Sequence, residues 1–356
     1  MFNKLKEECG IFGIYSKNNK DKLAYLTCIG LSALQHRGEE SCGIAANEDG
    51  IINYHKDMGL VSDVFTKKVL DKIPDSKMVI GHVRYSTTGL DKKENAQPLV
   101  VRYKKGNLAV AHNGNLTNTL DLKNKLANKG AIFTTTSDTE LICKVIVQER
   151  LKTHSMEDAI VRTMKKIKGA YSLLIMSSKK LIAVRDPQGF RPLCMGKLND
   201  NIMFASESCA FDILGGEFIR DLAPGEMVVV SDNKVIAKNY FPDKKHGMCI
   251  FEYIYFARPD SIMDGISIHH FRENTGRYLA KQAHVNADIV AGVPDSGIDA
   301  ALGYSKESGI PYDIVFTKSK YIGRTFIQNS QYKRQSTISL KLNPLKNVVK
   351  GKLTLL

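Results

Sequence analysis

Cys9 is the residue of this chain best suited to nucleophilic chemistry. It follows a polar leader, Met1–Glu8, and precedes an apolar stretch, Ile11–Ile14, that is typical of a strand. Loss of the leader would leave one residue with both a thiol and a free α-amino group. The amine titrates near ~7.7–8.0 and an ordinary thiol near ~8.5, so the amine can accept the thiol proton through a water. The sequence therefore predicts an N-terminal nucleophile; the alternative is a small buried cysteine on a first strand.

Three further motifs carry the groups that an amide-hydrolysing thiol needs. Arg84 follows a strand-like stretch and can form a two-pronged pair with a carboxylate. Asp138 stands before a helical stretch and can bind an ammonium group. Asn113 and Gly114 offer a side-chain amide and a backbone N–H to an oxyanion. Together with Cys9, these groups describe a site that recognises a free amino acid.

Each of these motifs also has a purely structural interpretation. Asp138 is a good helix N-cap, and Asn113-Gly114 is a common type I′ hairpin turn. Arg84 can form a surface ion pair. The sequence alone leaves these alternatives open.

Neither the histidines nor the cysteines show metal-ligand spacing. His36, His82 and His112 lie near glycine-containing turns, and we interpret them as packed, hydrogen-bonded imidazoles. The seven cysteines are scattered, with no CxxC pair, which indicates a reducing, cytoplasmic environment.

Length and composition restrict the class of protein. A chain of 356 residues with 43% hydrophobic and 25% charged residues is typical of a globular protein with two domains. No apolar run approaches the ~18 residues of a membrane span, and the leader lacks the apolar core of a secretory signal. The net charge is +14, but the lysines are spread along the chain. We therefore attribute the charge to small anionic substrates or to a lysine-rich genome, and we expect neither nucleic-acid nor membrane partners.

The hydrophobic pattern changes near residue 240. Before it, short strands accompany two helical stretches, 23–34 and 138–151, which predicts a layered α/β sandwich. After it, strands at 289–293 and 312–316 flank a helix at 298–308. This β-α-β order predicts a parallel sheet in a second domain. The turn at 294–297 presents N–H groups and the positive end of a helix dipole, which suits a pyrophosphate.

Seven motifs occur in order along the first part of the chain. They are CGIFG (9–13), LQHRGEES (34–41), GHVRYST (81–87), NAQP (95–98), HNGNL (112–116), SDTE (137–140) and RDPQGFRPL (185–193). With these motifs the chain resembles the glutaminase half of the amidophosphoribosyltransferase family, the class II amidotransferases that begin purine synthesis.

The resemblance implies an α/β protein with a four-layer αββα N-terminal-nucleophile glutaminase domain. The implied boundaries are a propeptide at 1–8, the glutaminase domain at 9–240 and a type I phosphoribosyltransferase domain at 241–356. Cys9 would attack the glutamine side-chain amide while its α-amino group shuttles the proton, and the ammonia would pass through a tunnel to the second site. The other implied roles are Arg84 for the glutamine carboxylate, Asp138 for its ammonium group, and Asn113 and Gly114 for the oxyanion. Arg37 is implied at the border of the pocket, as a further glutamine-binding residue.

Residues 249–261 and 318–326 are similar to the transferase half of the same family. By this resemblance Asp295, Ser296 and Gly297 form a pyrophosphate loop, with Ser296 near Mg²⁺. Tyr321 and Arg324 belong to a loop that closes over phosphoribosyl pyrophosphate. The family also suggests a cytoplasmic homotetramer.

Two further expectations concern the second domain. Cys249 matches the first cysteine of a structural 4Fe-4S cluster in one branch of the family, but its three partners are not among these residues, which makes a cluster doubtful here. The strand-like stretch 351–356 ends before the family's phosphoribosyl-binding loop, so we expect a truncated transferase half and glutaminase chemistry only. Two alternatives remain: a catalytically silent chain that binds a ligand or pairs with another subunit, and an amidotransferase with a different acceptor.

Overall fold

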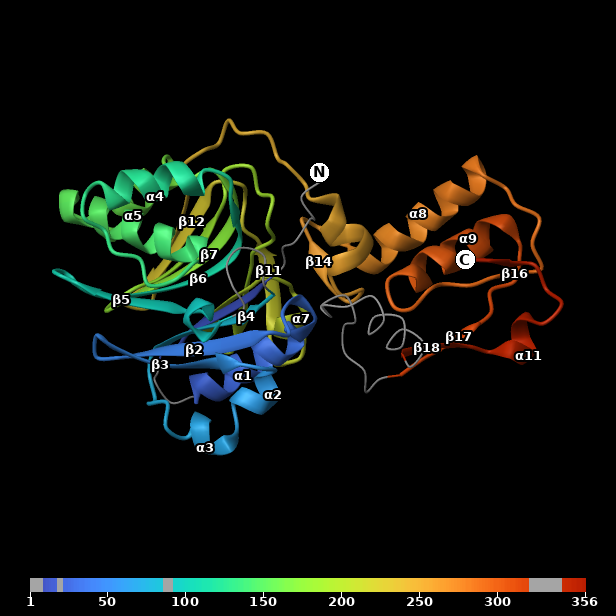
Figure 1. Cartoon of the computed structure of the whole chain (residues 1–356), viewed down its shortest axis with the longest axis horizontal. Coiled ribbons are helices and arrows are strands. Elements are labelled where there is room, and N and C mark those ends of the chain that lie inside the picture. The colour runs from blue at the N-terminus through green and yellow to red at the C-terminus, as the bar shows by residue number, and fades with distance from the viewer. Residues whose placement is uncertain (1–8, 18–21, 86–91, 320–340) are drawn as a thin grey trace. The chain divides into compact units, whose positions relative to one another are not determined.

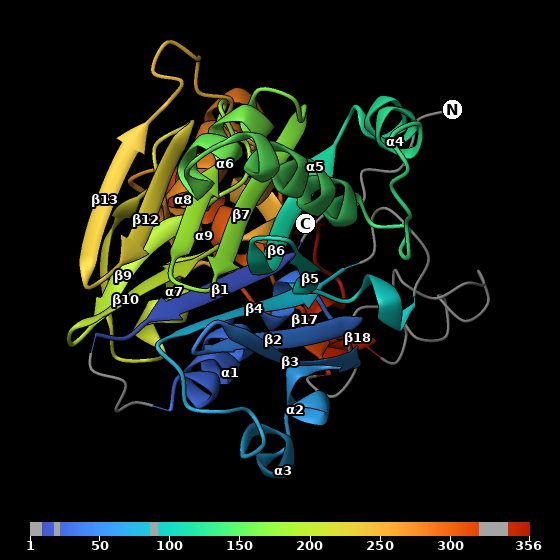
Figure 2. The ribbon, with the colours of Figure 1, turned by 90° about the vertical axis from the view of Figure 1, so that its left-hand side faces the viewer.

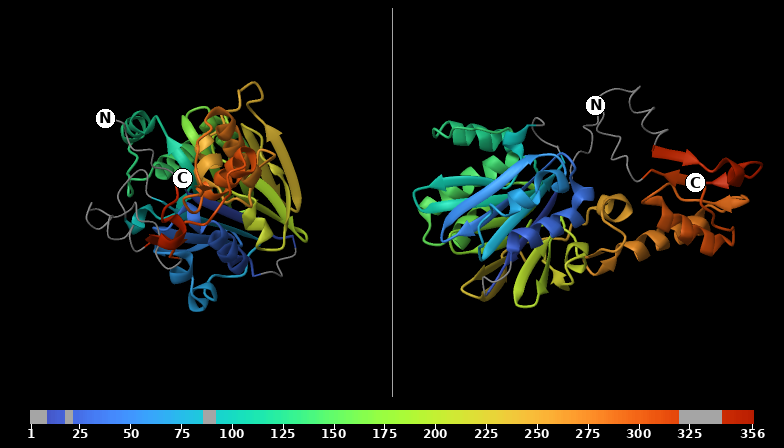
Figure 3. Two further views of the ribbon diagram at one scale, coloured as in Figure 1. Left: turned by 90° about the vertical axis from the view of Figure 1, so that its right-hand side faces the viewer. Right: turned by 90° about the horizontal axis from the view of Figure 1, so that it is seen from below.

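The computed structural model describes residues 9–17, 22–85, 92–319 and 341–356. The propeptide Met1–Glu8 and the loop residues Tyr321 and Arg324 therefore lie outside the described residues. The chain divides into two compact units. Unit 1 comprises residues 1–249 and 262–265, and unit 2 comprises 250–261 and 266–356. The two can be followed by colour in Figure 1 and Figure 3, where most of unit 1 is blue to yellow and most of unit 2 is orange to red.

Two antiparallel sheets form the centre of unit 1. Among the described residues, the first sheet has seven strands in the order β11-β9-β10-β1-β4-β2-β3. Its strands are β1 (Gly10–Tyr15), β2 (Ser41–Glu48), β3 (Ile51–Met58), β4 (Met78–Arg84), β9 (Cys194–Leu198), β10 (Asn201–Ala205) and β11 (Glu217–Asp221). The second sheet, also counted over the described residues, has six in the order β13-β12-β8-β7-β6-β5. Its strands are β5 (Leu99–Tyr103), β6 (Gly106–Leu116), β7 (Gly169–Ser177), β8 (Leu181–Arg185), β12 (Glu226–Ser231) and β13 (Lys234–Asn239).

Helices cover the outer faces of both sheets. In Figure 2, α1 lies against the sheet that contains β1 and β4, while α5 and α6 lie against the sheet that contains β6 and β7. The helices of unit 1 are α1 (Leu23–Ala33), α2 (Val61–Val64), α3 (Lys67–Leu70), α4 (Thr119–Ala127), α5 (Asp138–Lys152), α6 (Met156–Met164) and α7 (Cys209–Asp212). The unit also contains the 3₁₀ turns η1 (Gln35–Arg37) and η2 (Lys93–Asn95) and the short strand β14 (Ile262–Met263). This arrangement has the four layers αββα that the resemblance implies.

The alternation of side chains along the strands creates these layers. On β1, Ile11 packs between the two sheets while Phe12 packs under α1. On β6, Ala109 faces the space between the sheets and Val110 faces the outer helices. Because both faces of these strands are buried, their sequences are almost continuously apolar.

Unit 2 is built around two helices. Its elements are the π-helical turn η3 (Glu252–Phe256), β15 (Ile266–Ser267), α8 (Ile268–Gln282), β16 (Ile289–Val290), α9 (Gly297–Ser308), β17 (Phe316–Lys318), β18 (Leu342–Pro344), α11 (Lys346–Val349) and β19 (Thr354–Leu355). The predicted helix at 298–308 is confirmed as α9. β16 pairs in parallel with β19 and with Tyr312, so the predicted parallel pairing is also confirmed.

The strands predicted for unit 2 are shorter than expected. Of the stretch 289–293, only Ile289 and Val290 form a strand, and Tyr312 makes a single bridge instead of opening a strand at 312–316. Strand residues are defined by pairing with a neighbour, so an apolar run without a long partner is extended but not part of a sheet. Within the described ranges, no helix is both long and apolar enough to cross a bilayer.

Packing between the two sheets of unit 1 predicts a strong effect of truncating Leu174. This residue on β7 is fully buried, and a Cβ added to Gly13 on β1 would lie 2.9 Å from its Cδ1. Leu174→Ala should lower the free energy of unfolding by about 2–5 kcal/mol, because it leaves a cavity between the sheets. Leu120→Ala, at a position on α4 that is 71% exposed, should change it by less than about 0.5 kcal/mol. Urea unfolding followed by circular dichroism measures both; equal effects would contradict the sheet packing.

Candidate active site

Cys9 is held at the start of the central strand of unit 1. It directly precedes β1, which pairs with β4 along one edge and with β10 along the other. The thiol lies 3.8 Å from the carbonyl oxygen of Tyr85, to which it donates. The carbonyl oxygen of Cys9 accepts a hydrogen bond from Nε of Arg37 at 2.9 Å. Both the side chain and the backbone of Cys9 are therefore fixed.

The surroundings keep the thiol of Cys9 protonated at neutral pH. Burial raises its pKa to about 11, and the carboxylate of Asp138 adds to the rise. The guanidinium groups of Arg84 and Arg191 act in the opposite direction. Attack by the sulfur consequently requires a base that removes its proton.

Arg84 lies beside Cys9 because of the strand register. Val83 on β4 is paired with Gly10 on β1, so the next residue of β4 is opposite Cys9. Arg84 is only 3% exposed. The alternative of a surface ion pair at this position is therefore wrong.

Asn113 and Gly114 belong to a strand and not to a hairpin turn. They lie within β6, where Gly114 is paired with Tyr171 of β7. Gly114 has φ +142°, and a Cβ at this position would lie 2.1 Å from the carbonyl oxygen of Ala170, so only glycine fits. The interpretation as a type I′ turn is wrong because the chain continues through this pair without reversing.

Asn113 is linked to the chain next to Cys9 through Ser206. Its Nδ2 donates to Oγ of Ser206 at 3.3 Å, and the same oxygen accepts the N–H of Ile11 at 3.0 Å. Asn113 is fully buried, and its Oδ1 has no hydrogen-bond partner among the described residues. The contact joins the second sheet to the first within two residues of the nucleophile.

Asp138 is a buried, ionised carboxylate. It is the first residue of α5, and the helix is capped instead by Ser137, whose side chain accepts the N–H of Thr139 at 3.2 Å. The Oδ2 atom of Asp138 accepts the N–H of Leu116 at 3.0 Å. Burial opposes ionisation, but His112 and backbone N–H donors outweigh it and lower the pKa of Asp138 below its usual range.

The three histidines near the site are packed and hydrogen-bonded, as the sequence indicated. Nε2 of His82 lies 3.0 Å from the carbonyl oxygen of His112, and burial lowers the pKa of His82 to about 3. Nδ1 of His112 lies 3.2 Å from Oγ1 of Thr139. His36 contacts Glu207, with 2.7 Å between Nε2 and Oε1. His82 and His112 lie inside strands, whereas we expected them beside turns.

The sequence interpretation missed Glu207. Its buried Oε1 accepts a hydrogen bond from a terminal nitrogen of Arg37 at 2.5 Å as well as contacting His36. Arg37 in turn holds the carbonyl of Cys9, so Glu207 acts on the nucleophile through Arg37. Ser206 was missed too. The signal was present in the sequence: Ser206 and Glu207 are polar residues directly after the buried strand β10.

Arg191 was likewise not assigned a role by the sequence. Its carbonyl oxygen accepts hydrogen bonds from Oγ of Ser172 at 3.1 Å and from Nε of Arg185 at 2.9 Å. Arg185 is buried and makes a bidentate pair with Asp264 at 2.6 and 3.0 Å. This pair fixes the loop that carries Arg191.

The predicted phosphate-binding residues lie in a turn of unit 2. Asp295 and Ser296 precede α9, which begins at Gly297. The N–H of Gly297 donates to the carbonyl of Val293 at 3.1 Å, and the carboxylate of Asp295 pairs with Lys318. The structure thus brings an exposed carboxylate, a lysine and a helix N-terminus together.

The described residues do not fit a 4Fe-4S cluster. Such a cluster takes four thiolates. Cys249 is half-buried, and within the described part of the chain no group of three or more potential metal ligands includes it.

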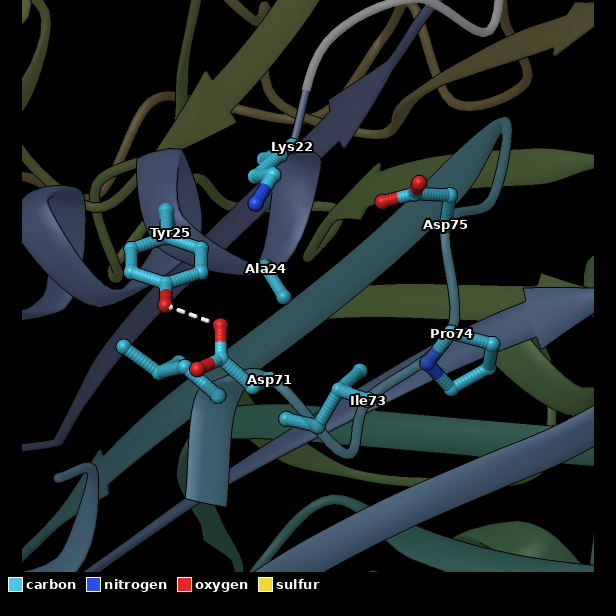
Figure 4. A pocket seen from close by; sticks show the side chains of 8 residues that line it. Lys22, Ala24, Tyr25, Asp71, Ile73, Pro74 and Asp75 are labelled. Atoms are coloured by element: carbon cyan, nitrogen blue, oxygen red, sulfur yellow. Dashed lines mark hydrogen bonds between the residues drawn. The ribbon is translucent and has the colours of Figure 1, made fainter. Parts of the chain in front are cut away.

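A pocket in unit 1 lies away from these groups. It is lined by Lys22, Ala24, Tyr25, Leu70, Asp71, Ile73, Pro74 and Asp75 (Figure 4). Asp75 comes three residues before Met78, which is paired with Tyr15, at the end of β1 opposite Cys9. The hydroxyl of Tyr25 donates to Asp71 at 2.6 Å, so part of the polar lining is already satisfied. Cys9 is not among the residues that line this pocket.

The chain is similar to known proteins over most of its length. A family profile described as "Glutamine amidotransferase domain" matches residues 82–212. An amidophosphoribosyltransferase of Methanocaldococcus jannaschii is 48% identical over an alignment of 361 residues, which covers 97% of this chain and 76% of the relative. The amidophosphoribosyltransferase of Bacillus subtilis is 44% identical over 349 residues, which cover 98% of this chain and 72% of the relative.

Two solved structures are similar over nearly the whole chain. One is described as glutamine phosphoribosylpyrophosphate amidotransferase from B. subtilis complexed with ADP and GMP. It has a TM-score of 0.88 and 43% identity, and the match covers 97% of this chain and 74% of that chain. The other is described as the structure of the allosteric regulatory enzyme of purine biosynthesis, with a TM-score of 0.89 and 43% identity over 97% of this chain and 73% of that chain.

The raised pKa of Cys9 predicts slow alkylation by iodoacetamide, which reacts with the thiolate. At a pKa of about 11, about one thiol in a thousand is ionised at pH 8, so the rate should rise about tenfold per pH unit up to about pH 10. The measurement is made on protein that still carries Met1–Glu8, and intact mass verifies that these residues are present. Peptide mapping by mass spectrometry separates Cys9 from the half-buried Cys249. A rate that levels off below pH 9 would contradict the raised pKa.

The buried contact between Glu207 and Arg37 predicts a large loss of stability on Glu207→Gln. Removing this carboxylate should lower the free energy of unfolding by about 3–5 kcal/mol, because a buried guanidinium loses its charge partner. The matched control is Glu217→Gln, which removes an exposed pair with Lys197 and should cost less than about 1 kcal/mol. Urea unfolding measures both variants. If the two losses are alike, Glu207 does not carry the buried pair.

Proposed function

Because the chain belongs to the amidophosphoribosyltransferase family, we propose that unit 1 hydrolyses glutamine at Cys9 and that unit 2 binds the acceptor of the ammonia, phosphoribosyl pyrophosphate. The predicted fold class, a glutaminase domain followed by a phosphoribosyltransferase domain, is confirmed by the solved structures that the chain resembles. The chain is thus related throughout to enzymes of purine biosynthesis, whereas the alternative of a different acceptor finds no support. One observation carries the site assignment: the strand register places Arg84 opposite Cys9, and Ser206 links Asn113 to the backbone two residues after the thiol.

Glutamine recognition rests on these two charges. A free amino acid carries a carboxylate and an ammonium group, and the site offers one guanidinium and one ionised carboxylate. Arg84 would pair with the glutamine carboxylate and Asp138 with the ammonium group. Both side chains are at most 6% exposed, so the ionic contacts form in a site of low dielectric constant.

The nucleophilic step needs a base because the thiol is protonated. After loss of Met1–Glu8, the α-amino group of Cys9 would accept the thiol proton while Sγ attacks the side-chain amide carbon of glutamine. The proton then passes to the leaving nitrogen, ammonia departs, and a thioester to Sγ remains. Water hydrolyses the thioester to glutamate and restores the thiol.

Asn113 and Gly114 are proposed to stabilise the oxyanion of this step. A primary amide has two N–H donors, and Nδ2 of Asn113 uses one of them on Ser206. The second N–H can serve the oxyanion together with the N–H of Gly114. Ser206 fixes the amide before substrate arrives, which reduces the reorganisation that the reaction requires.

We propose that Arg37 positions the nucleophile instead of binding substrate. Its Nε–H donates to the carbonyl of Cys9, and Glu207 holds its other end. Because the guanidinium is fully buried, it is well placed to fix the backbone of the first residue of the processed chain.

The transferase half is proposed for unit 2. Asp295, Ser296 and Gly297 would form the pyrophosphate loop, and the oxygen donors of Asp295 and Ser296 are of the kind that Mg²⁺ prefers, so these residues fit Mg²⁺, which would neutralise charge on the pyrophosphate. Tyr321 and Arg324 would contact the same substrate. A cytoplasmic homotetramer is part of this proposal. We propose that this chain carries out the glutaminase half-reaction, because unit 1 supplies every group named above for that reaction.

Cys9→Ala tests the proposal directly. Glutamate release from glutamine should fall by about a thousandfold or more, since the variant lacks the sulfur that forms the thioester. Cys28→Ala is the matched control: Cys28 lies on α1, has no assigned role and should leave the rate unchanged. Intact mass of the wild-type protein shows whether residues 1–8 are absent. A processed wild-type chain without glutaminase activity, or an active Cys9→Ala variant, would contradict the proposal and favour the silent alternative.

A further inference from the structure

We propose that unit 2 binds a transition-metal dication such as Zn²⁺ through His269, His270 and Glu273 on α8. One ligand atom from each of these side chains lies within 4.8 Å of the others, and among the described residues no other such group of three exists. None of the three has a role in the proposed glutaminase or transferase chemistry. Imidazole and carboxylate are usual ligands of Zn²⁺.

The contact between His269 and Asp299 sets the imidazole for metal binding. Nδ1 of His269 lies 2.9 Å from Oδ1 of Asp299 on α9. A carboxylate only accepts, so in the neutral imidazole the proton is on Nδ1 and the lone pair is on Nε2. A carboxylate that holds the second nitrogen is the usual support of a histidine that binds a metal.

The nitrogen of His269 that carries the lone pair lies near a carboxylate oxygen. Nε2 lies 3.9 Å from Oε2 of Glu273, which is too far for a hydrogen bond. Two electron-pair donors at this separation suit a shared cation. Ligands of a tetrahedral zinc at 2.0–2.2 Å are about 3.4 Å apart, so a small contraction brings this pair to bonding distance.

Two further features support a built site. Asp299 is 7% exposed, and its Oδ2 has no hydrogen-bond partner among the described residues. Glu273 is 8% exposed. His270 is exposed and can rotate to complete the ligand set from the solvent side. The site therefore combines a buried carboxylate ligand, Glu273, with a buried carboxylate that supports His269, Asp299. The exposed ligand, His270, can adjust its position.

Close packing of the helices fixes the spacing of these groups. A Cβ added to Gly276 on α8 would lie 1.8 Å from the carbonyl oxygen of Ala300, and one added to Gly303 on α9 would lie 1.8 Å from that of Glu273. The backbones of α8 and α9 touch at the level of the site, and Figure 1 shows the two helices side by side. Such preorganisation lowers the cost of binding a metal.

Two cations share the other oxygen of Glu273. Its Oε1 accepts hydrogen bonds from Arg277 at 2.9 Å and from Lys306 at 2.8 Å. These contacts leave Oε2 for the metal and keep the carboxylate ionised. Both cationic side chains are at least 38% exposed, so solvent screens their repulsion of a dication.

Titration of the metal-free 356-residue protein with ZnCl₂ by calorimetry tests the site. The expected result is one Zn²⁺ per chain at this site. His270→Ala should weaken binding by at least about tenfold, because it removes a ligand without disturbing a buried contact. Asp299→Asn should weaken it by about 10- to 100-fold, as for other residues that orient a metal-bound histidine. His284→Ala, an exposed histidine of the same unit, is the matched control and should bind like the wild type.

Binding by cysteine thiols is distinguished by spectroscopy. Co²⁺ at the proposed site should give ligand-field bands without a thiolate charge-transfer band, and these bands should be lost in His270→Ala. The proposal is overturned if Zn²⁺ does not bind, if His270→Ala and Asp299→Asn bind like the wild type, if His284→Ala weakens binding as much as they do, or if Co²⁺ shows thiolate ligation only. Because the readout is metal binding, the result is independent of glutaminase activity.

Discussion

The burial of β1 is the constraint on which the candidate site depends. The strand is hydrogen-bonded along both edges, to β4 and β10, and covered on both faces by α1 and the second sheet. Its start is therefore fixed, and with it the backbone of Cys9. The register of β4 then places Arg84 next to the thiol. Packing of the second sheet brings β6 and the first turn of α5 to the same point. A nucleophile on a flexible terminus would have no such fixed relation to its neighbours.

Buried charge determines the chemistry that this position can support. Burial raises the pKa of Cys9, which makes a separate base necessary, while the same low dielectric constant strengthens every ionic contact made to a substrate. The protein stabilises its own buried charges by pairing them: Arg37 contacts Glu207, Arg185 contacts Asp264, and Asp138 has backbone donors. Arg84 and Asp138 are buried charges of opposite sign, which suits the proposed binding of an amino acid.

In unit 2, the packing of α8 against α9 likewise fixes the relative positions of charged side chains. Small residues let α8 and α9 approach, so that Asp299 and Glu273, which come from different helices, meet around one imidazole. The close backbone contact sets the spacing of these side chains. Such a site can arise independently of the pyrophosphate turn, which precedes α9 in the chain.

Local order along the chain predicted the elements and named residues that the structure brings together around Cys9. Hydrophobic periodicity located α1, α5 and α9 within one or two residues, and the motifs identified Cys9, Arg84, Asn113 and Asp138, because spacing along one element is encoded in neighbouring residues. The tertiary structure decided what those residues touch. Glu207 and Ser206, about 200 residues after Cys9, reach its surroundings only through the packing of β10 beside β1, and Asn113-Gly114 is a strand because β7 pairs with it. Contacts between distant segments depend on how the strands pair and how the sheets pack. A periodic pattern within one segment does not specify which other segment pairs with it.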